Sequence, residues 1–172
     1  MRSDADLPTL IATSIGGDRE SFGELYRRFS RPVHGVLMAR LAPEDAEDLT
    51  HDVFMHALEH LWELREPAAF GGWICAIARR RATDHHRRTR PTEVLADTHA
   101  ATDRPDVSAD AHRALAEIQR LPEAYRETLV LRLVEGLTGP EIAAATGLTP
   151  DSVRVNLHRG FRLLRGQLGV TP

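Results

Sequence analysis

The chain has 172 residues, enough for one or two small domains, and its 25 acidic side chains outnumber 22 basic ones to give a net charge of −3. This balance excludes a uniformly basic nucleic-acid-binding protein, and no run approaches the ~18 apolar residues of a membrane-spanning helix. The single cysteine, Cys75, cannot form an internal disulfide and no signal-peptide pattern is present, so we expect a cytoplasmic protein.

The first ninety residues predict a bundle of amphipathic helices. Helices are expected at about 7–15 and 18–30, with Asp18 as the N-cap of the second, and another is expected to start near Pro32. Pro43 opens a clearer helix over 43–63. Its inward stripe consists of Ala46, Leu49, Val53, Ala57 and Leu61, widened by Phe54 and Leu58.

The outer side of the 43–63 helix is acidic. Glu44 and Asp45 lie in its first turn, where carboxylates favour the helix dipole. Asp48 and Asp52 lie further along, one turn apart, and the dipole does not account for them. They predict a docking face for a basic partner.

A loop over 63–72, rich in Pro and Gly, precedes a helix that starts at 70 or 73 and runs to 88. Six arginines fall between positions 79 and 90. Cations are favoured at a helix C-terminus, but this density exceeds what a helix end requires. We interpret the cluster as an electrostatic footprint for nucleic-acid phosphate.

Residues 91–110 nearly lack large apolar side chains and carry five acids against one arginine, which predicts a flexible acidic linker. Helical patterns resume at Ala111, break at Pro122 and end near Gly136. No segment alternates like a strand. The sequence predicts an all-α protein with a first helical domain over 1–90, a linker over 91–110 and a second helical domain over 111–172.

The segment Thr138–Arg165 predicts a helix-turn-helix. Thr138 can cap the first helix, Gly147 can end it at positive φ, and Thr149-Pro150 can start the second. Apolar positions of the second helix face inward and leave a row of arginines outside, which is typical of a DNA-reading helix. The alternative is a plain helical hairpin whose arginines are only solvated.

These motifs together resemble the extracytoplasmic-function (ECF) sigma factors of the sigma-70 family. The segment LPEAYRETLVLRLVEGLTGPEIAAATGLTPDSVRVNLHRGFRLLR (121–165) is similar to their C-terminal DNA-binding domain. FGELYRRF (22–29), AEDLTHDVFMHAL (46–58) and WICAIARRRATDHHRR (73–88) resemble their promoter-melting domain, in the same order. The resemblance covers nearly everything outside the linker.

The resemblance implies a cytoplasmic transcription initiation factor that is not an enzyme, has no catalytic residue, cofactor or metal, and takes no small-molecule substrate. It implies docking on the β′ coiled coil of core RNA polymerase through Asp45, Asp48, Leu49, His51, Asp52 and Phe54. It implies contact with the promoter −10 element through Phe70, Trp73, Arg79, Arg80, Asp84, Arg87 and Arg88. It implies contact with the −35 element through Thr149, Ser152, Arg154, Val155, Asn156, His158, Arg159 and Arg162. The free protein is expected to be a monomer, with an anti-sigma factor as a further partner.

Four positions depart from the family pattern. His51 replaces the usual glutamine of the acidic helix, and Arg80 stands where asparagine is usual after Ala-Arg. In the recognition helix, Val155-Asn156 replaces the common Ser-Arg pair. Since arginine reads guanine and asparagine reads adenine, we expect an unusual −35 sequence.

Two alternative classes remain at this point. His56 and His60, four residues apart on one helix, could share a metal in a metal-dependent hydrolase. An ordinary repressor or response-regulator output domain could use the same helix-turn-helix, but that class leaves the 43–90 region unexplained. No glycine-rich phosphate loop supports nucleotide binding.

Overall fold

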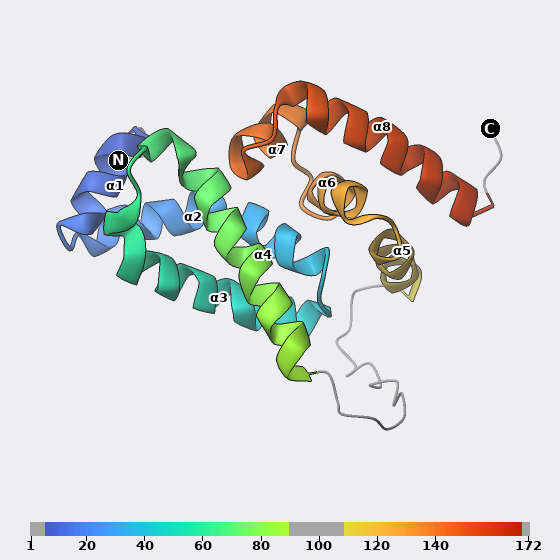
Figure 1. Ribbon diagram of the computed structural model, residues 1–172, viewed down its shortest axis with the longest axis horizontal. Coiled ribbons are helices and arrows are strands. Elements are labelled where there is room, and N and C mark those ends of the chain that lie inside the picture. Colours follow the sequence, from blue (N-terminus) through green and yellow to red (C-terminus); the bar gives the residue numbers. More distant parts are fainter. Residues whose placement is uncertain (1–5, 90–108, 170–172) are drawn as a thin grey trace.

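The computed structural model describes residues 6–89 and 109–169, and within these ranges the chain is helical without strands (Figure 1), which confirms the all-α prediction. The first helix group contains α1 (Leu7–Ile15), α2 (Arg19–Met38), α3 (Pro43–His60), the 3-10 turns η1 (Leu61–Glu63) and η2 (Pro67–Ala69), and α4 (Phe70–Thr89). The second contains α5 (Ala109–Gln119), α6 (Glu123–Leu133), α7 (Gly139–Thr146) and α8 (Pro150–Gln167). None of these helices has both the length and the apolar content needed to cross a bilayer.

Helix α2 is longer than the sequence predicted. Asp18 caps it as expected, accepting a hydrogen bond from the backbone N–H of Glu20 at 3.1 Å. Pro32 does not start a new helix but lies inside α2, so the prediction of a break there is wrong. A proline costs an interior helix about 3 kcal/mol. The buried Val33, Val36 and Leu37 that follow it outweigh this cost by packing into the core.

Helix α3 and the following turn cover the predicted 43–63 segment, although the last three residues are 3-10 rather than α. Its predicted stripe is buried at Ala46, Val53 and Ala57, but Leu58 is 40% exposed and does not widen it. Helix α4 begins at Phe70, the earlier of the two predicted starts, because the Phe70 side chain is fully buried and anchors the first turn.

The predicted helix-turn-helix is confirmed in detail. Thr138 and Glu141 form a reciprocal capping box, in which the Glu141 carboxylate accepts from the Thr138 backbone N–H at 2.7 Å. Gly147 ends α7 with φ of +75°, a left-handed conformation that favours glycine. Thr149 then caps α8 by accepting from the Ser152 backbone N–H at 3.1 Å. Most of the predicted linker lies outside the described residues, and α5 begins at Ala109, two residues before the expected Ala111.

The two helix groups pack against each other around a shared core that includes residues of α1 to α6 and of α8, while α7 packs in a smaller cluster with Leu131 and Val153. Helices α6 and α7 lie on α2 and α4 (Figure 1). Glycines permit this close approach: a Cβ on Gly35 of α2 would lie 2.6 Å from Leu131 Cδ2 of α6, and one on Gly71 of α4 would lie 2.7 Å from the Ala144 carbonyl oxygen of α7. A side chain at Gly71 would collide with backbone oxygens of α7, and one at Gly35 would require the side chains of Leu131 and Glu135 to move.

Candidate nucleic-acid interface

Helix α8 is held by one face and exposes the other. Val153 and Leu164 are buried, and Gly160 between them lets the helix approach Leu129 of α6, whose Cδ1 would lie 3.0 Å from an added Cβ. Leu157 and Phe161 pack partly buried on the same side. The predicted inward positions of the recognition helix are therefore confirmed, and its outward side is fixed by the packing.

Nearly all of the predicted −35 residues lie on or beside the exposed side of α8. Exposed members of the set are Thr149, Ser152, Arg154, Val155, His158, Arg159 and Arg162, whereas Asn156 is half buried. Arg154 pairs with Asp151 at 3.2 Å, and both side chains remain largely exposed, so this pair is weak and can be exchanged for DNA. A helix of this kind, with polar and arginine side chains outward, has the shape and chemistry for the major groove.

The predicted −10 residues divide into exposed and buried groups along α4. Arg80, Arg87 and Arg88 are exposed, and Arg87 pairs with Asp84 at 3.1 Å. Phe70 has no exposed surface, because it packs edge-on against Phe29 and beside Trp73. In this arrangement Phe70 supports Trp73, which is only partly buried, and the contact of Phe70 with DNA stays a prediction.

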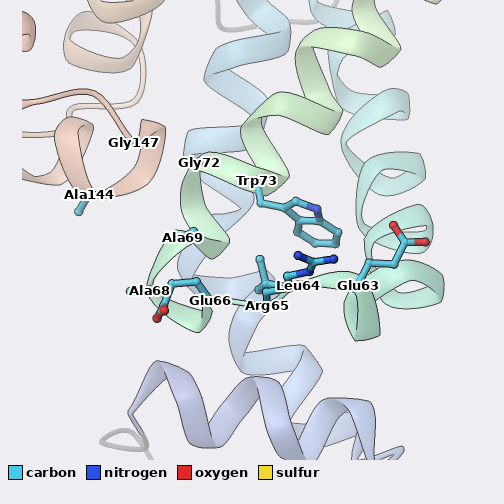
Figure 2. Close-up of a pocket in the computed structure, with 10 residues that line it drawn as sticks. All are labelled: Glu63, Leu64, Arg65, Glu66, Ala68, Ala69, Gly72, Trp73, Ala144 and Gly147. Atoms are coloured by element: carbon cyan, nitrogen blue, oxygen red, sulfur yellow. The ribbon is translucent and has the colours of Figure 1, made fainter.

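A pocket of about 440 Å³ lies at the start of α4, between the helix groups. Figure 2 shows Trp73 turned toward the segment after η1, with Ala144 and Gly147 of the second group on the other side. The lining residues are Glu63, Leu64, Arg65, Glu66, Ala68, Ala69, Gly72, Trp73, Ala144 and Gly147. An apolar hollow with an aromatic wall can accept an unstacked base.

Arg79 lies in a buried ionic cluster that the sequence did not predict. Its guanidinium donates to both carboxylate oxygens of Glu127 on α6, at 2.6 and 3.1 Å, and Arg40 at the end of α2 donates to the same carboxylate at 2.8 Å. The side chains of Glu127 and Arg40 are only 8% and 7% exposed. Burial alone would raise the pKa of Glu127, but the hydrogen bonds and charge of Arg79, with those of Arg40, hold it below its usual value.

A second polar contact joins the groups at the far end of α6. Glu135 follows α6, and its carboxylate lies 2.7 Å from Nδ1 of His34 on α2. The backbone carbonyl of Glu135 accepts a hydrogen bond from the Arg31 guanidinium. Both acids are nearly buried. Sequence reasoning missed Glu127 and Glu135 because their partners lie 48 to 104 residues away in the chain.

The acidic side of α3 is available as predicted, apart from one aromatic residue. Asp48, His51 and Asp52 are exposed, Leu49 is partly buried, and Asp45 pairs with His85 of α4 at 3.2 Å. Phe54 is 1% exposed and packs against Phe22 and Tyr26 with ring centroids 6.3 and 4.5 Å away. Phe54 therefore supports this face from beneath, and its contact with polymerase stays a prediction.

Cys75 is a core residue. Its burial raises the pKa of the thiol to about 12, and the thiol donates a hydrogen bond to the Ala145 carbonyl at 3.3 Å, which joins α4 to α7.

Among the described residues, one group of side chains could hold a metal ion: His56, Glu59 and His60 near the end of α3.

Comparison with known proteins agrees with this geometry. Residues 25–92 match the Sigma-70 region 2 family, and residues 111–164 match the Sigma-70 region 4 family. The chain is 32% identical to the RNA polymerase sigma factor CarQ of Myxococcus xanthus, over 89% of this chain and 92% of CarQ. It is 30% identical to the ECF RNA polymerase sigma factor SigM of Mycobacterium tuberculosis, over 98% of this chain and 86% of SigM.

Two solved structures share the fold. CnrH, solved in complex with the cytosolic domain of CnrY, superposes with a TM-score of 0.66 at 22% identity, over 95% of this chain and 97% of CnrH. The sigma factor RpoE of Bartonella quintana, solved with the anti-sigma factor NepR, gives a TM-score of 0.62 at 18% identity, over 89% of this chain and 99% of RpoE.

Proposed function

The chain belongs to the extracytoplasmic-function sigma factors of the sigma-70 family, and we propose that it joins core RNA polymerase in the cytoplasm and selects promoters through two separate DNA contacts. Members of this family are transcription initiation factors and not enzymes, which removes the metal-dependent hydrolase as an alternative. The observation that carries the proposal is the outward side of α8, where Arg154, Arg159 and Arg162 stand exposed on a rigidly packed helix.

We assign the −35 contact to this side of α8. Arginine and asparagine side chains can read base edges in the major groove, while the hydroxyls of Thr149 and Ser152 at the helix start suit a phosphate. The two hydroxyl oxygens lie 2.8 Å apart, so they form one polar corner. The apolar packing beneath α8 fixes which residues point outward, and therefore the register of the readout.

We assign the −10 contact to the pocket at Trp73 and the arginines of α4. Promoter melting requires a place for an extruded base and a basic track for the single strand. The wall of the pocket that belongs to the first helix group, formed by Trp73 with residues 63–66, 68 and 69, supplies the first, and Arg80, Arg87 and Arg88 supply the second along one helix. The acidic side of α3 (Asp48, His51 and Asp52) is the proposed docking face for the basic side of a polymerase coiled coil.

The packed arrangement of the two helix groups is not the one that would bind DNA at both sites. Arg79 is held by Glu127, and Ala144 and Gly147 wall one side of the pocket. We propose that the groups separate when the protein joins polymerase, and that an anti-sigma factor opposes this change. The structure of RpoE with the anti-sigma factor NepR supports such a partner by analogy.

Run-off transcription with core RNA polymerase tests the proposal. We expect the purified protein to direct initiation at defined start sites on genomic fragments, and the Arg154→Ala/Arg159→Ala double variant to lose most of this activity while its melting temperature stays unchanged. Both side chains are exposed, so their removal should not affect folding. Arg27→Ala is the control, because Arg27 is an exposed arginine on α2 outside all proposed contacts.

Two outcomes would contradict the proposal. Absence of any initiation with core RNA polymerase, together with tight binding of duplex DNA as a dimer, would identify a repressor. Full transcription by the double variant would show that α8 does not read the promoter.

A further inference from the structure

The last turn of α3 brings three metal-ligating side chains together. Glu59 follows His56 by three residues and His60 follows it by four, so the three side chains lie on one side of the helix. Their available ligand atoms lie within 4.8 Å of one another, and the two imidazole centroids are 4.1 Å apart. The sigma-factor assignment uses none of the three.

A hydrogen bond already fixes the state of one ligand. Nδ1 of His60 lies 2.9 Å from the backbone carbonyl oxygen of His56. Because a carbonyl oxygen can only accept, Nδ1 must carry the proton, which leaves Nε2 of the neutral ring with a free lone pair. Metal-binding histidines show this same outer bond, in which one ring nitrogen donates to a backbone carbonyl while the other binds the ion.

We propose that His56, Glu59 and His60 form a binding site for a divalent transition-metal ion such as Zn²⁺ or Ni²⁺. Two imidazoles and one carboxylate match the ligands that such ions take, with water completing the coordination. Each ligand atom must come within about 2.0–2.2 Å of the ion, so binding requires these three side chains to rotate toward a common point.

The electrostatic surroundings are mixed. The site lies at the helix C-terminus, where a cation is favoured, and Glu59 adds a negative charge. Burial lowers the pKa of His56, and the positive charges of Arg80 and Arg81 on the adjacent α4 lower it further and disfavour a further cation there. We therefore expect a site of moderate affinity whose ion bridges His56 and His60 and braces the last turn of α3.

This brace adjoins the proposed base pocket. The chain passes from His60 through η1 to Glu63 and Leu64, which line the pocket, and Trp62 within η1 donates its indole N–H to the Glu59 carbonyl at 3.1 Å. An ion that stabilises the end of α3 would restrain one side of the pocket. The binding site itself rests on these side chains alone and does not depend on the proposed DNA contacts.

Calorimetric titration of the tag-free, full-length protein with ZnCl₂, and separately with NiCl₂, tests the proposal. We expect one ion per chain and a melting temperature that rises with metal concentration, because the ion binds the folded chain. His56→Ala and His60→Ala should each weaken binding by at least the ~10–100-fold caused by loss of an outer-shell partner. Glu59→Gln should weaken it less, since one charged ligand becomes neutral.

His51→Ala is the matched control, because His51 is an exposed histidine on the same helix outside the group. It should bind metal as the wild type does. Absence of stoichiometric binding by the wild type would overturn the proposal, as would unchanged binding in His56→Ala. An equal loss in His51→Ala would also overturn it by showing diffuse binding to surface histidines. Circular dichroism of each variant confirms that the helices remain.

Discussion

Asn156 lies half buried on α8, between the exposed Val155 and the inward-facing Leu157. At the matching position the family resemblance leads us to expect arginine. The two side chains recognise different bases, because arginine donates twice to guanine whereas asparagine pairs with adenine through one donor and one acceptor. A single residue on an otherwise ordinary recognition helix can therefore redirect the −35 preference.

The Asn156→Arg variant is expected to shift the preferred −35 sequence toward guanine at one position. A good bidentate pair contributes about 1–3 kcal/mol of discrimination, which corresponds to roughly 5- to 150-fold. Selection from a library randomised over the −35 element measures this shift. His112→Arg adds the same charge on an exposed site of α5 and should leave the preference as it is. An unchanged preference in Asn156→Arg would refute the assignment.

The contact between α4 and α7 depends on small residues and on carbonyls at the end of a short helix. Gly71 of α4 faces the carbonyl oxygens of Ala144 and Ala145, and Gly72 faces Gly147 with an added Cβ at 3.5 Å from its Cα. Cys75, one turn later, donates to the Ala145 carbonyl. The left-handed Gly147 thus has two roles, because it ends α7 and leaves space for α4.

Gly71→Ala should weaken this contact. The new methyl would lie 2.7 Å from one carbonyl oxygen and 2.8 Å from the next, and overpacking of this kind costs about 1–3 kcal/mol. We expect a lower melting temperature and a larger radius of gyration by small-angle scattering.

Gly166→Ala is the matched control for that substitution. Gly166 lies in α8 and an added Cβ meets nothing within 4 Å, so this variant should gain about 0.4–1 kcal/mol instead. A Gly71→Ala protein as stable and compact as the wild type would show that the α4–α7 contact tolerates a side chain and does not control the packing.

At the scale of the whole molecule, Glu127 occupies Arg79, one of the arginines predicted to contact the −10 element. Its carboxylate receives a bidentate Arg79 guanidinium, the geometry that arginine also uses for phosphate. The second helix group therefore occupies an arginine that belongs to the predicted −10 contact. In the binding mode that we propose, closure of the two groups and phosphate binding at Arg79 exclude each other.

Glu127→Gln should open the molecule and strengthen binding of a single-stranded −10 oligonucleotide. Removing one partner of a buried ion pair costs about 3–5 kcal/mol, and here two arginines lose their carboxylate. Small-angle scattering and fluorescence anisotropy measure the two effects. Glu24→Gln is the control, because Glu24 pairs with Arg27 and Arg28 within α2 alone. A variant that stays compact and binds DNA no better would contradict the proposed competition.

Acid should also separate the two helix groups of the wild-type protein. The pKa of Glu127 is lower in the folded chain than its unfolded value of about 4.3, so its stabilisation is complete above that pH. It is lost as the pH falls through the lowered folded-state pKa. The scattering radius should therefore increase below about pH 4 in the wild type, and this increase should be smaller in Glu127→Gln.

The sequence alone determined the local features of this protein. The Asp18, Thr138 and Thr149 caps, the positive φ of Gly147 and the inward side of α8 follow from interactions between residues a few positions apart. Helical period and turn chemistry are local, so they can be recognised without a fold. The family resemblance also rested on such contiguous motifs, and the comparisons confirm it.

Tertiary structure decided what depends on distant partners. Pro32 continues a helix because the core around it compensates, and Phe54 and Phe70 are supports because other aromatic rings cover them. The pairing of Glu127 with Arg40 and Arg79 joins residues up to 87 positions apart. Burial and charge pairing across such separations depend on how the helix groups pack, and no local pattern in the chain encodes that arrangement.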